Sequence, residues 1–165
     1  MTNTYANRGM MLERLITLTN KQYKRDGVAL VQKIPTPVKV LKKMPYGQIK
    51  GHFEAKSTVD YVGVYKGMYI CFDAKECDNT SFPLKNIETH QLEHMKAVKE
   101  QGGRAFVLIY MKKYDRYFGL GYKDLEKFIE TNERKSIPLR YLEEFAQEIH
   151  TDDNGYVINY LCITK

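Results

Sequence analysis

Residues 58–76 read TVDYVGVYKGMYICFDAKE, and this stretch decides the fold. Residues 59–65 and 68–76 are both rich in β-branched and aromatic residues, which favour strands. Lys66 and Gly67 separate the two runs, and a two-residue connection of this kind predicts a β-hairpin. The stretch is therefore predicted to form two paired strands of a sheet.

The register of this hairpin brings two carboxylates together. With a two-residue loop, Asp60 lies directly opposite Asp73. Thr58 then lies opposite Lys75, and strand periodicity places Lys75 on the same face as Asp73. Facing carboxylates repel each other, and a divalent cation between them removes that penalty. The predicted face has the groups that metal-assisted phosphodiester hydrolysis requires, although a salt bridge between Lys75 and either Asp is the alternative interpretation.

The rest of the chain predicts a mixed β-sheet flanked by helices, in the α/β class. Helices are predicted over 7–25, 86–101, 122–131 and 138–149, and further strands over 28–34, 104–112, 114–121 and 156–163. Residues 77–85 are predicted to form a polar loop, followed by Asn86 as a helix N-cap. The length of 165 residues predicts a single domain over 1–165.

Residues 35–56 form a distinct basic segment. The net charge between residues 33 and 56 is +5, from six lysines and Glu54, within a chain of net charge +6. Apolar and basic residues alternate here around a turn signal at Pro45-Tyr46-Gly47, with too few apolar residues for a core. We expect an extended basic arm that suits a polyanion such as nucleic acid. A solvated lysine-rich surface is the alternative.

The composition also excludes several classes of protein. The longest apolar run, residues 105–111, has seven residues, whereas a membrane span needs about 18. Three cysteines are too few for a disulfide scaffold, and the N-terminal residues lack the hydrophobic segment of a secretory signal. We therefore expect a cytoplasmic protein. His90 and His94 are spaced to chelate a transition metal, with Cys71 and Cys77 near them in sequence. That cysteine spacing is unusual for zinc, so surface histidines are the alternative.

Asp60, twelve intervening residues and Asp73-Ala74-Lys75 resemble the PD-(D/E)xK nuclease motif, with Val59 in place of the proline. The surrounding sequence resembles RecU, the Holliday-junction resolvase family of Gram-positive bacteria and some of their phages. The resembling blocks, in the family's order, are NRG at 7–9, KIPTPV at 33–38, TVDYVGVYKG at 58–67, TSFPL at 80–84 and HQLEHM at 90–95. The likeness covers about residues 7–112. It implies a restriction-endonuclease-like α/β core with a protruding basic stalk over 35–56.

The resemblance also implies roles for individual residues. The implied catalytic set is Lys75, Asp60, Asp73 and Glu13, where Glu13 matches an acidic position on the first helix. The implied metal site holds Mg²⁺, or Mn²⁺ in its place, through Asp60, Asp73, Thr58 and Gln91. The implied DNA contacts are Lys39, Lys42, Lys43, Lys50, Tyr46 and Arg8.

The function that the resemblance implies is a homodimeric, metal-dependent endonuclease. It would make symmetric nicks in four-way DNA junctions during homologous recombination and repair. Two features depart from the family: Asp73 stands where Glu is usual, and the arm is shorter and richer in lysine. The alternatives are a non-catalytic junction-binding or recombinase-modulating protein and a branch or flap nuclease of the same fold. A recombinase stays open as a partner, and no membrane partner is expected.

Overall fold

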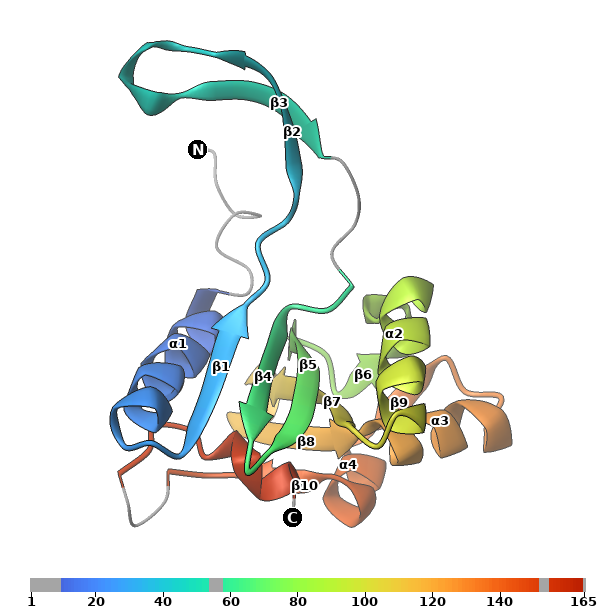
Figure 1. Cartoon of the computed structure of the whole chain (residues 1–165). Helices are drawn as coiled ribbons and strands as arrows, with labels where there is room; N and C mark the ends of the chain where they lie inside the picture. Colours follow the sequence, from blue (N-terminus) through green and yellow to red (C-terminus); the bar gives the residue numbers. More distant parts are fainter. Residues whose placement is uncertain (1–9, 54–57, 152–154, 165) are drawn as a thin grey trace.

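The computed structural model describes residues 10–53, 58–151 and 155–164 (Figure 1). The body contains a six-stranded sheet with the strand order β1-β4-β5-β7-β8-β10. Strands β5 and β7 are parallel, whereas the other neighbouring strands of this sheet are antiparallel. The strands are β1 (Ala29–Lys33), β4 (Tyr61–Tyr65), β5 (Met68–Cys77), β7 (Arg104–Met111), β8 (Arg116–Gly121) and β10 (Gln147–Ile149). The helices are α1 (Met10–Arg25), α2 (Thr89–Glu100), α3 (Tyr122–Thr131) and α4 (Leu139–Phe145). The predicted α/β fold class is confirmed.

The sheet separates two hydrophobic cores, because successive residues of a strand point to opposite faces. On one face, Cys71 of β5 packs in a core with Met95 of α2. On the other face, Phe72 packs in a core with Ile16 of α1. All four side chains are fully buried, and each large apolar one contributes about 1.5–3 kcal/mol to folding. Within the described ranges, no helix is long and apolar enough to cross a membrane.

The β4–β5 hairpin has the register predicted from its sequence. Tyr65 pairs with Met68 across a turn in which Lys66 and Gly67 both have positive φ, 50° and 79°. Positive φ at both central residues suits the twist of a hairpin, although it costs Lys66 about 1 kcal/mol.

A stack of three aromatic rings stabilises the register of the β4–β5 hairpin. Phe72 lies between Tyr61 of β4 and Phe106 of β7, with ring centroids 4.8 and 4.7 Å apart and planes tilted by only 10°. The three residues are direct cross-strand partners. If one of these strands shifted by one residue, its ring would move to the opposite face of the sheet and the stack would be lost. The stack therefore fixes how β4, β5 and β7 align.

Two predicted pairings are not formed in the ladder. The β4–β5 ladder ends at Tyr61 and Phe72, so neither Asp60 with Asp73 nor Thr58 with Lys75 is a pair of strand partners. The reason lies at Asp60, whose carbonyl accepts a hydrogen bond from the Ile34 N–H at 2.8 Å. Its N–H is directed to a side chain of β5 rather than to a main-chain carbonyl.

The predicted arm forms a second, two-stranded sheet of β2 (Val38–Lys43) and β3 (Ile49–Phe53). It projects from the body in Figure 1, beyond the upper ends of β1 and β4. A short 3₁₀ turn at Pro45–Gly47 joins the strands, and residues 35–53 are all exposed. The extended hairpin is confirmed, whereas residues 54–56 of the predicted arm lie outside the described residues.

Two predictions for the C-terminal part are wrong. The helix predicted over 138–149 ends at Phe145, because residues 147–149 pair with β8 as β10. The strand predicted over 156–163 is a 3₁₀ helix, Tyr160–Thr164, preceded by irregular chain. Side chains of α1 bind the main chain of this segment: Thr19 Oγ1 accepts the Ile158 N–H at 3.2 Å. The main chain of this segment therefore bonds to side chains of α1 instead of pairing with a neighbouring strand.

Two predictions around residues 77–89 also need correction. The predicted polar loop contains β6 (Ser81–Pro83), which pairs with β9 (Ser136–Pro138) far along the chain. The N-cap of α2 is Glu88 and not Asn86, which lies in a preceding 3₁₀ turn. The Glu88 side chain accepts a main-chain N–H of the first helical turn, the role that Asn86 was expected to play.

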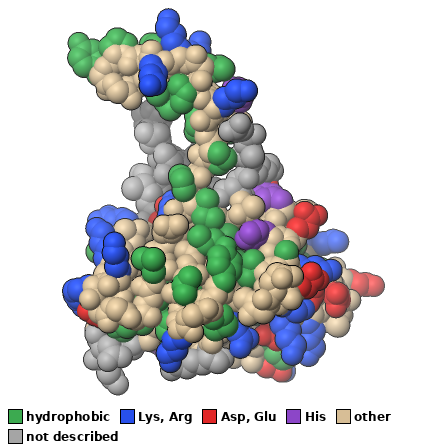
Figure 2. All heavy atoms as spheres, in the orientation of Figure 1, with side chains coloured by type: hydrophobic (Ala, Val, Ile, Leu, Met, Phe, Trp, Pro, Cys, Tyr) green, Lys and Arg blue, Asp and Glu red, His purple; other side chains and the backbone are tan. Residues whose placement is uncertain are grey.

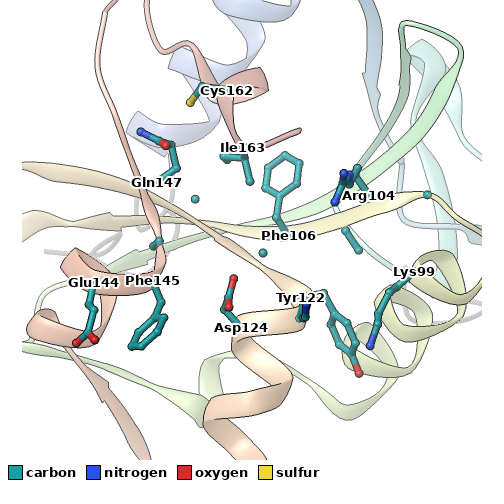
Figure 3. Close-up of a pocket in the computed structure, with 16 residues that line it drawn as sticks. Lys99, Arg104, Phe106, Tyr122, Asp124, Glu144, Phe145, Gln147, Cys162 and Ile163 are labelled. Carbon is teal, nitrogen blue, oxygen red and sulfur yellow. The ribbon is translucent and has the colours of Figure 1, made fainter. Parts of the chain in front are cut away.

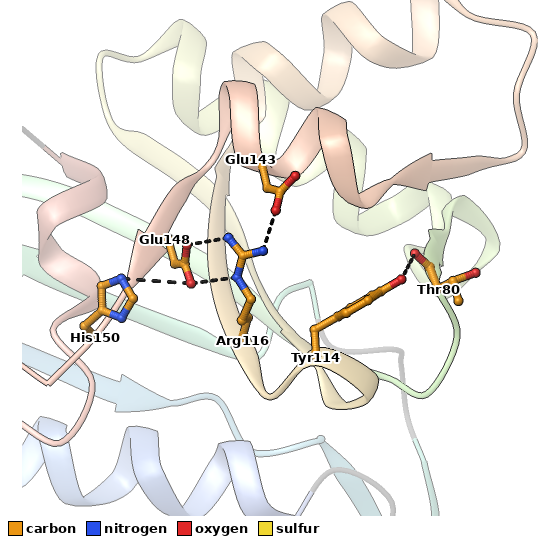
Figure 4. Close-up of polar contacts among 6 residues, drawn as sticks. All are labelled: Thr80, Tyr114, Arg116, Glu143, Glu148 and His150. Atoms are coloured by element: carbon orange, nitrogen blue, oxygen red, sulfur yellow. Dashed lines mark hydrogen bonds and ion pairs between the residues drawn. The ribbon is translucent and has the colours of Figure 1, made fainter.

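An ion-pair cluster ties β8, α4 and β10 together on the side of the body shown in Figure 4. Arg116 donates to both oxygens of Glu148, at 2.8 and 2.6 Å, and also bonds Glu143 of α4. The Arg116 guanidinium lowers the pKa of Glu148. Bidentate geometry makes this cluster a stronger link than a single surface ion pair.

Candidate active site

Asp60 and Asp73 hold each other in place by two hydrogen bonds. The main-chain N–H of Asp60 donates to Oδ1 of Asp73 at 3.0 Å. In return, the N–H of Ala74 donates to Oδ2 of Asp60 at 3.0 Å. Each carboxylate thus accepts a main-chain N–H from the other strand, and the aromatic stack beside them holds these strands in register. The two acids that the sequence predicts as partners are therefore adjacent.

Lys75 completes this cluster from β5. Its Nζ lies 2.6 Å from Oδ2 of Asp73, two residues earlier on the same strand face. The Asp73 side chain is 0% exposed, whereas that of Lys75 is 20% exposed. A buried carboxylate is therefore linked to an ammonium that reaches the surface.

The site strongly perturbs the ionisation of Asp73. Burial is the main cause, and it raises the pKa of Asp73 to about 6. The negative charge of Asp60 raises it as well, while Lys75 opposes both effects. Groups with perturbed pKa values next to a charged partner are common at functional sites.

The donor set fits a hard divalent cation. Oδ2 of Asp73 is buried and accepts no hydrogen bond within the described residues, although it faces the Lys75 ammonium. A cation at this carboxylate would compensate a charge that the fold leaves only partly neutralised. No group of three His, Cys, Asp or Glu side chains that could hold a metal occurs in the described part of the chain. Mg²⁺ is commonly bound by one or two carboxylates, with water and substrate phosphate as its other ligands.

Glu13 is not bonded to this pair of acids. It forms an ion pair with Lys33 at 2.6 Å, and both side chains are about half exposed, 46% and 50%. Lys33 is the direct strand partner of Tyr61, which precedes the site on β4. Burial raises the pKa of the Tyr61 hydroxyl, and the charges of Glu13 and Asp60 raise it further. Glu13 therefore lies near the site without touching its centre.

The two other residues predicted for the metal site also lie outside the central cluster. Gln91 is 8% exposed, and its side-chain oxygen accepts the Glu88 N–H at 2.9 Å in the capping box of α2. Thr58 is exposed, two residues before Asp60. Gln91 belongs to the helix that covers the Asp73 face of the sheet, as Met95 of the same helix packs there.

Sequence reasoning missed Glu76 and Lys112. Oε1 of Glu76 accepts the Leu12 N–H at 2.8 Å, and Oε2 lies 2.7 Å from Lys112 Nζ. The Glu76 side chain is 6% exposed. It satisfies a free N–H in the first turn of α1, one residue before Glu13, and so fixes this helix to β5. Strand alternation could have indicated Glu76, because it follows Lys75 and must point to the opposite, α1 face. Its partner Leu12 could not be predicted, since it is 64 residues away in the sequence.

The residues predicted to contact DNA lie mostly on the arm. Tyr46 at the tip is fully exposed, and the other described members are exposed on β2 and β3: Lys39, Lys42, Lys43 and Lys50. Tyr46 has a positive φ of 60°, which turns the chain at the tip. Arg8 lies outside the described residues.

A cavity of about 640 Å³ lies away from this cluster. Figure 3 shows Arg104, Tyr122, Asp124 and Gln147 around it. Arg104 begins β7 and pairs with Ile70, three residues before Asp73 on β5. Because Asp73 and Lys75 lie toward the other end of these strands, the cavity is not part of the site.

Comparison with known proteins agrees with the geometry. A family model described as RecU, Recombination protein U, matches residues 7–165. The Holliday junction resolvase RecU of Pediococcus pentosaceus is 43% identical over 162 residues, which cover 93% of this chain and 81% of that protein. The protein of the same name from Bacillus subtilis is 44% identical over 173 residues, 98% of this chain and 82% of that one.

A solved structure shares the fold. Archaeoglobus fulgidus Hjc, a Holliday junction resolvase from an archaeal hyperthermophile, matches with a TM-score of 0.52 over 85% of this chain and 95% of that one. Its sequence is only 13% identical, so this likeness concerns the fold. Because the family model spans nearly the whole chain and the relatives above are more than 40% identical, the chain belongs to the RecU family.

Proposed function

We propose that this chain is a Holliday junction resolvase, a metal-dependent endonuclease that cuts four-way DNA junctions. The observation that carries the proposal is the hydrogen-bonded pair of Asp60 and Asp73, with Lys75 beside it. RecU relatives that bear the resolvase name support it. The proposal covers residues 1–165 as one nuclease domain with the arm over 35–56.

Asp60 and Asp73 would hold the divalent ion, which we propose to be Mg²⁺, with Mn²⁺ able to replace it. When bound, such an ion activates a water molecule as the nucleophile and offsets charge on the phosphate. The ammonium of Lys75 is positioned to stabilise the negative charge that develops on the phosphate oxygens. Attack by water at phosphorus with loss of the 3′ oxygen leaves a 5′-phosphate and a 3′-hydroxyl. Thr58 and Gln91 are proposed as further residues of the metal site, and Glu13 as a further catalytic residue.

We also propose that two copies act together. Leu30, Val64 and Tyr69 are cross-strand neighbours on β1, β4 and β5, and they are 58%, 47% and 42% exposed. Figure 2 shows hydrophobic side chains over these strands. An exposed apolar row supports a contact with a second copy, whose two-fold symmetry would match the two equivalent strands of a junction.

Sedimentation tests the homodimer. Val64→Asp is expected to shift the protein from dimer to monomer, because a charge would be buried in the contact. Ile129→Asp is the matched control, since Ile129 is 38% exposed on α3, away from the row. A wild-type protein that sediments as a monomer at micromolar concentration would contradict this part of the proposal.

Cleavage of a labelled four-way junction tests the function itself. The matching linear duplex is the substrate control, and each reaction is run with Mg²⁺, with Mn²⁺ and with EDTA. We expect paired symmetric nicks that need the metal and are abolished in Asp73→Asn. Glu133→Gln, which removes an exposed acid from the loop after α3, should cut like the wild type. Tight junction binding without cuts in either metal would instead favour a non-catalytic binding protein, and equal cutting of flaps would favour a branch nuclease.

A further inference from the structure

The side chains of the arm are sorted onto two faces. The strand β3 is regular, so Ile49, Gly51 and Phe53 lie on one face and Lys50 and His52 on the other. In an antiparallel pair, directly opposite residues share a face. The partners of β3 therefore show on which face each residue of β2 lies.

One face is cationic. Lys42 is the partner of Lys50, and Lys39 is the partner of His52. We call these four residues the cationic face. Residues 38–53 contain no Asp or Glu, and no ion pair to these lysines occurs among the described residues.

The opposite face is mainly apolar. It consists of three cross-strand pairs: Val38 with Phe53, Val40 with Gly51, and Lys43 with Ile49. We call it the apolar face, and Lys43 near the tip is its one charged member within the described pairs.

An irregularity in β2 produces this separation. The register shifts between Val40 and Lys42, which leaves Leu41 without a partner in the ladder. Strict alternation along β2 would place Lys42 on the face of Val40 and Lys43 on the other. The extra residue reverses this order, so that Lys42 joins the cationic face and Lys43 does not.

The cationic face is electrostatically unfavourable in the free protein. Lys42 and Lys50 are directly opposite, and like charges at this spacing destabilise a strand pair. The next basic pair, Lys39 with His52, lies two residues farther along β3, about 7 Å away. This separation resembles that of successive phosphates along a nucleic acid strand. A phosphate at the Lys42–Lys50 pair would relieve their repulsion, and a phosphate at the next pair would contact the Lys39 ammonium.

We propose that the arm contacts branched DNA through its cationic face only, with the Lys42–Lys50 pair on one backbone phosphate and the Lys39–His52 pair on a neighbouring one. The proposal rests on the proposed function, because it takes a DNA junction as the substrate, and it adds which residues of the arm the phosphates meet. Lys43 lies one residue from Lys42 and carries the same charge, yet it makes no phosphate contact.

The salt dependence of junction binding tests this assignment. Affinity for a labelled four-way junction is measured by fluorescence anisotropy in EDTA, across a series of salt concentrations. The double variant Lys42→Ala with Lys50→Ala should lower the slope of log K against log salt by about 0.9, since the one phosphate contact of this pair is lost. Lys43→Ala with Lys50→Ala is the matched control: it removes the same charge but leaves Lys42 on the phosphate, so the slope should stay unchanged. In the Lys42→Ala background, exchanging residues 49 and 50 (Ile49→Lys with Lys50→Ile) keeps the net charge of that background and should lower the slope by about 0.9.

Two other results are informative in different ways. If Lys43→Ala with Lys50→Ala lowers the slope as much as Lys42→Ala with Lys50→Ala, the arm acts as diffuse charge and the inference is overturned while the function stands. If the wild-type protein shows no salt-dependent binding of the junction, the proposed function itself is contradicted, and the result says nothing about which face of the arm contacts DNA. All substituted residues are exposed, and circular dichroism of each variant serves as the check that it is folded.

Discussion

Nζ of Lys75 lies 2.6 Å from Oδ2 of Asp73, and it joins a partly exposed ammonium to a carboxylate that is 0% exposed. Burial nevertheless dominates, since the pKa of Asp73 is raised to about 6 despite this ion pair. The fold therefore favours the protonated form of Asp73 over its ionised form. Such a site gains from a cation, and its properties lead to predictions about stability, pH and metal binding.

Asp73→Asn should stabilise the metal-free protein. The pKa of Asp73 is about 6 in the folded state against its ordinary value of 3.8, so ionisation costs stability progressively between these values and fully above pH 6. The variant should therefore gain up to about 3 kcal/mol in unfolding free energy at pH 8 and nothing near pH 3.5. Urea unfolding in EDTA at both pH values measures this, and an equal effect at both would contradict the burial argument.

Cleavage should rise with pH through about 6, because Asp73 must lose its proton before it can hold a cation. Lys75 lowers the pKa of Asp73, so Lys75→Met should move the midpoint of metal binding to higher pH. The same variant should lose about 100- to 1,000-fold in cleavage at saturating metal. Isothermal titration with Mg²⁺ across pH separates the two effects, and an unshifted midpoint in Lys75→Met would argue against the coupling.

Paired variants of the α2 capping box decide the role of Gln91. Gln91→Ala and Glu88→Ala each break the box and should cost about 1 kcal/mol of stability. Gln91→Ala alone should also weaken Mg²⁺ binding, because only Gln91 is proposed to belong to the metal site. Equal metal affinity in the two variants would show that Gln91 acts only in the helix cap and not in the metal site.

Glu76 and Lys112 should be energetically coupled. Lys112→Met leaves a carboxylate that is 6% exposed without its ammonium, while Glu76→Gln removes the charge and keeps an oxygen for the Leu12 N–H. Each single variant is expected to be destabilised, and the double variant by less than the sum, with a coupling of about 1–3 kcal/mol. Additive effects in urea unfolding would show that the ion pair between Glu76 and Lys112 does not contribute to stability.

Much of the site could be predicted from the sequence because its determinants are local. The Lys66-Gly67 turn sets the β4–β5 register, and this register together with strand alternation places Asp60, Asp73 and Lys75 together. The exposed arm is predictable for a similar reason, since its alternating lysines cannot form a core. In both cases the informative residues lie within about twenty positions of one another.

The tertiary structure alone decided which groups these residues meet. Glu13 meets Lys33 on β1, and Glu76 meets α1, at separations of 20 and 64 residues. The segment predicted as a last strand is instead held by Thr19, at a separation of 139 residues. Local pattern specifies which way a side chain points, because periodicity is a property of the chain itself. It does not specify the partner, because a hydrogen bond or ion pair depends on what another segment brings to that position.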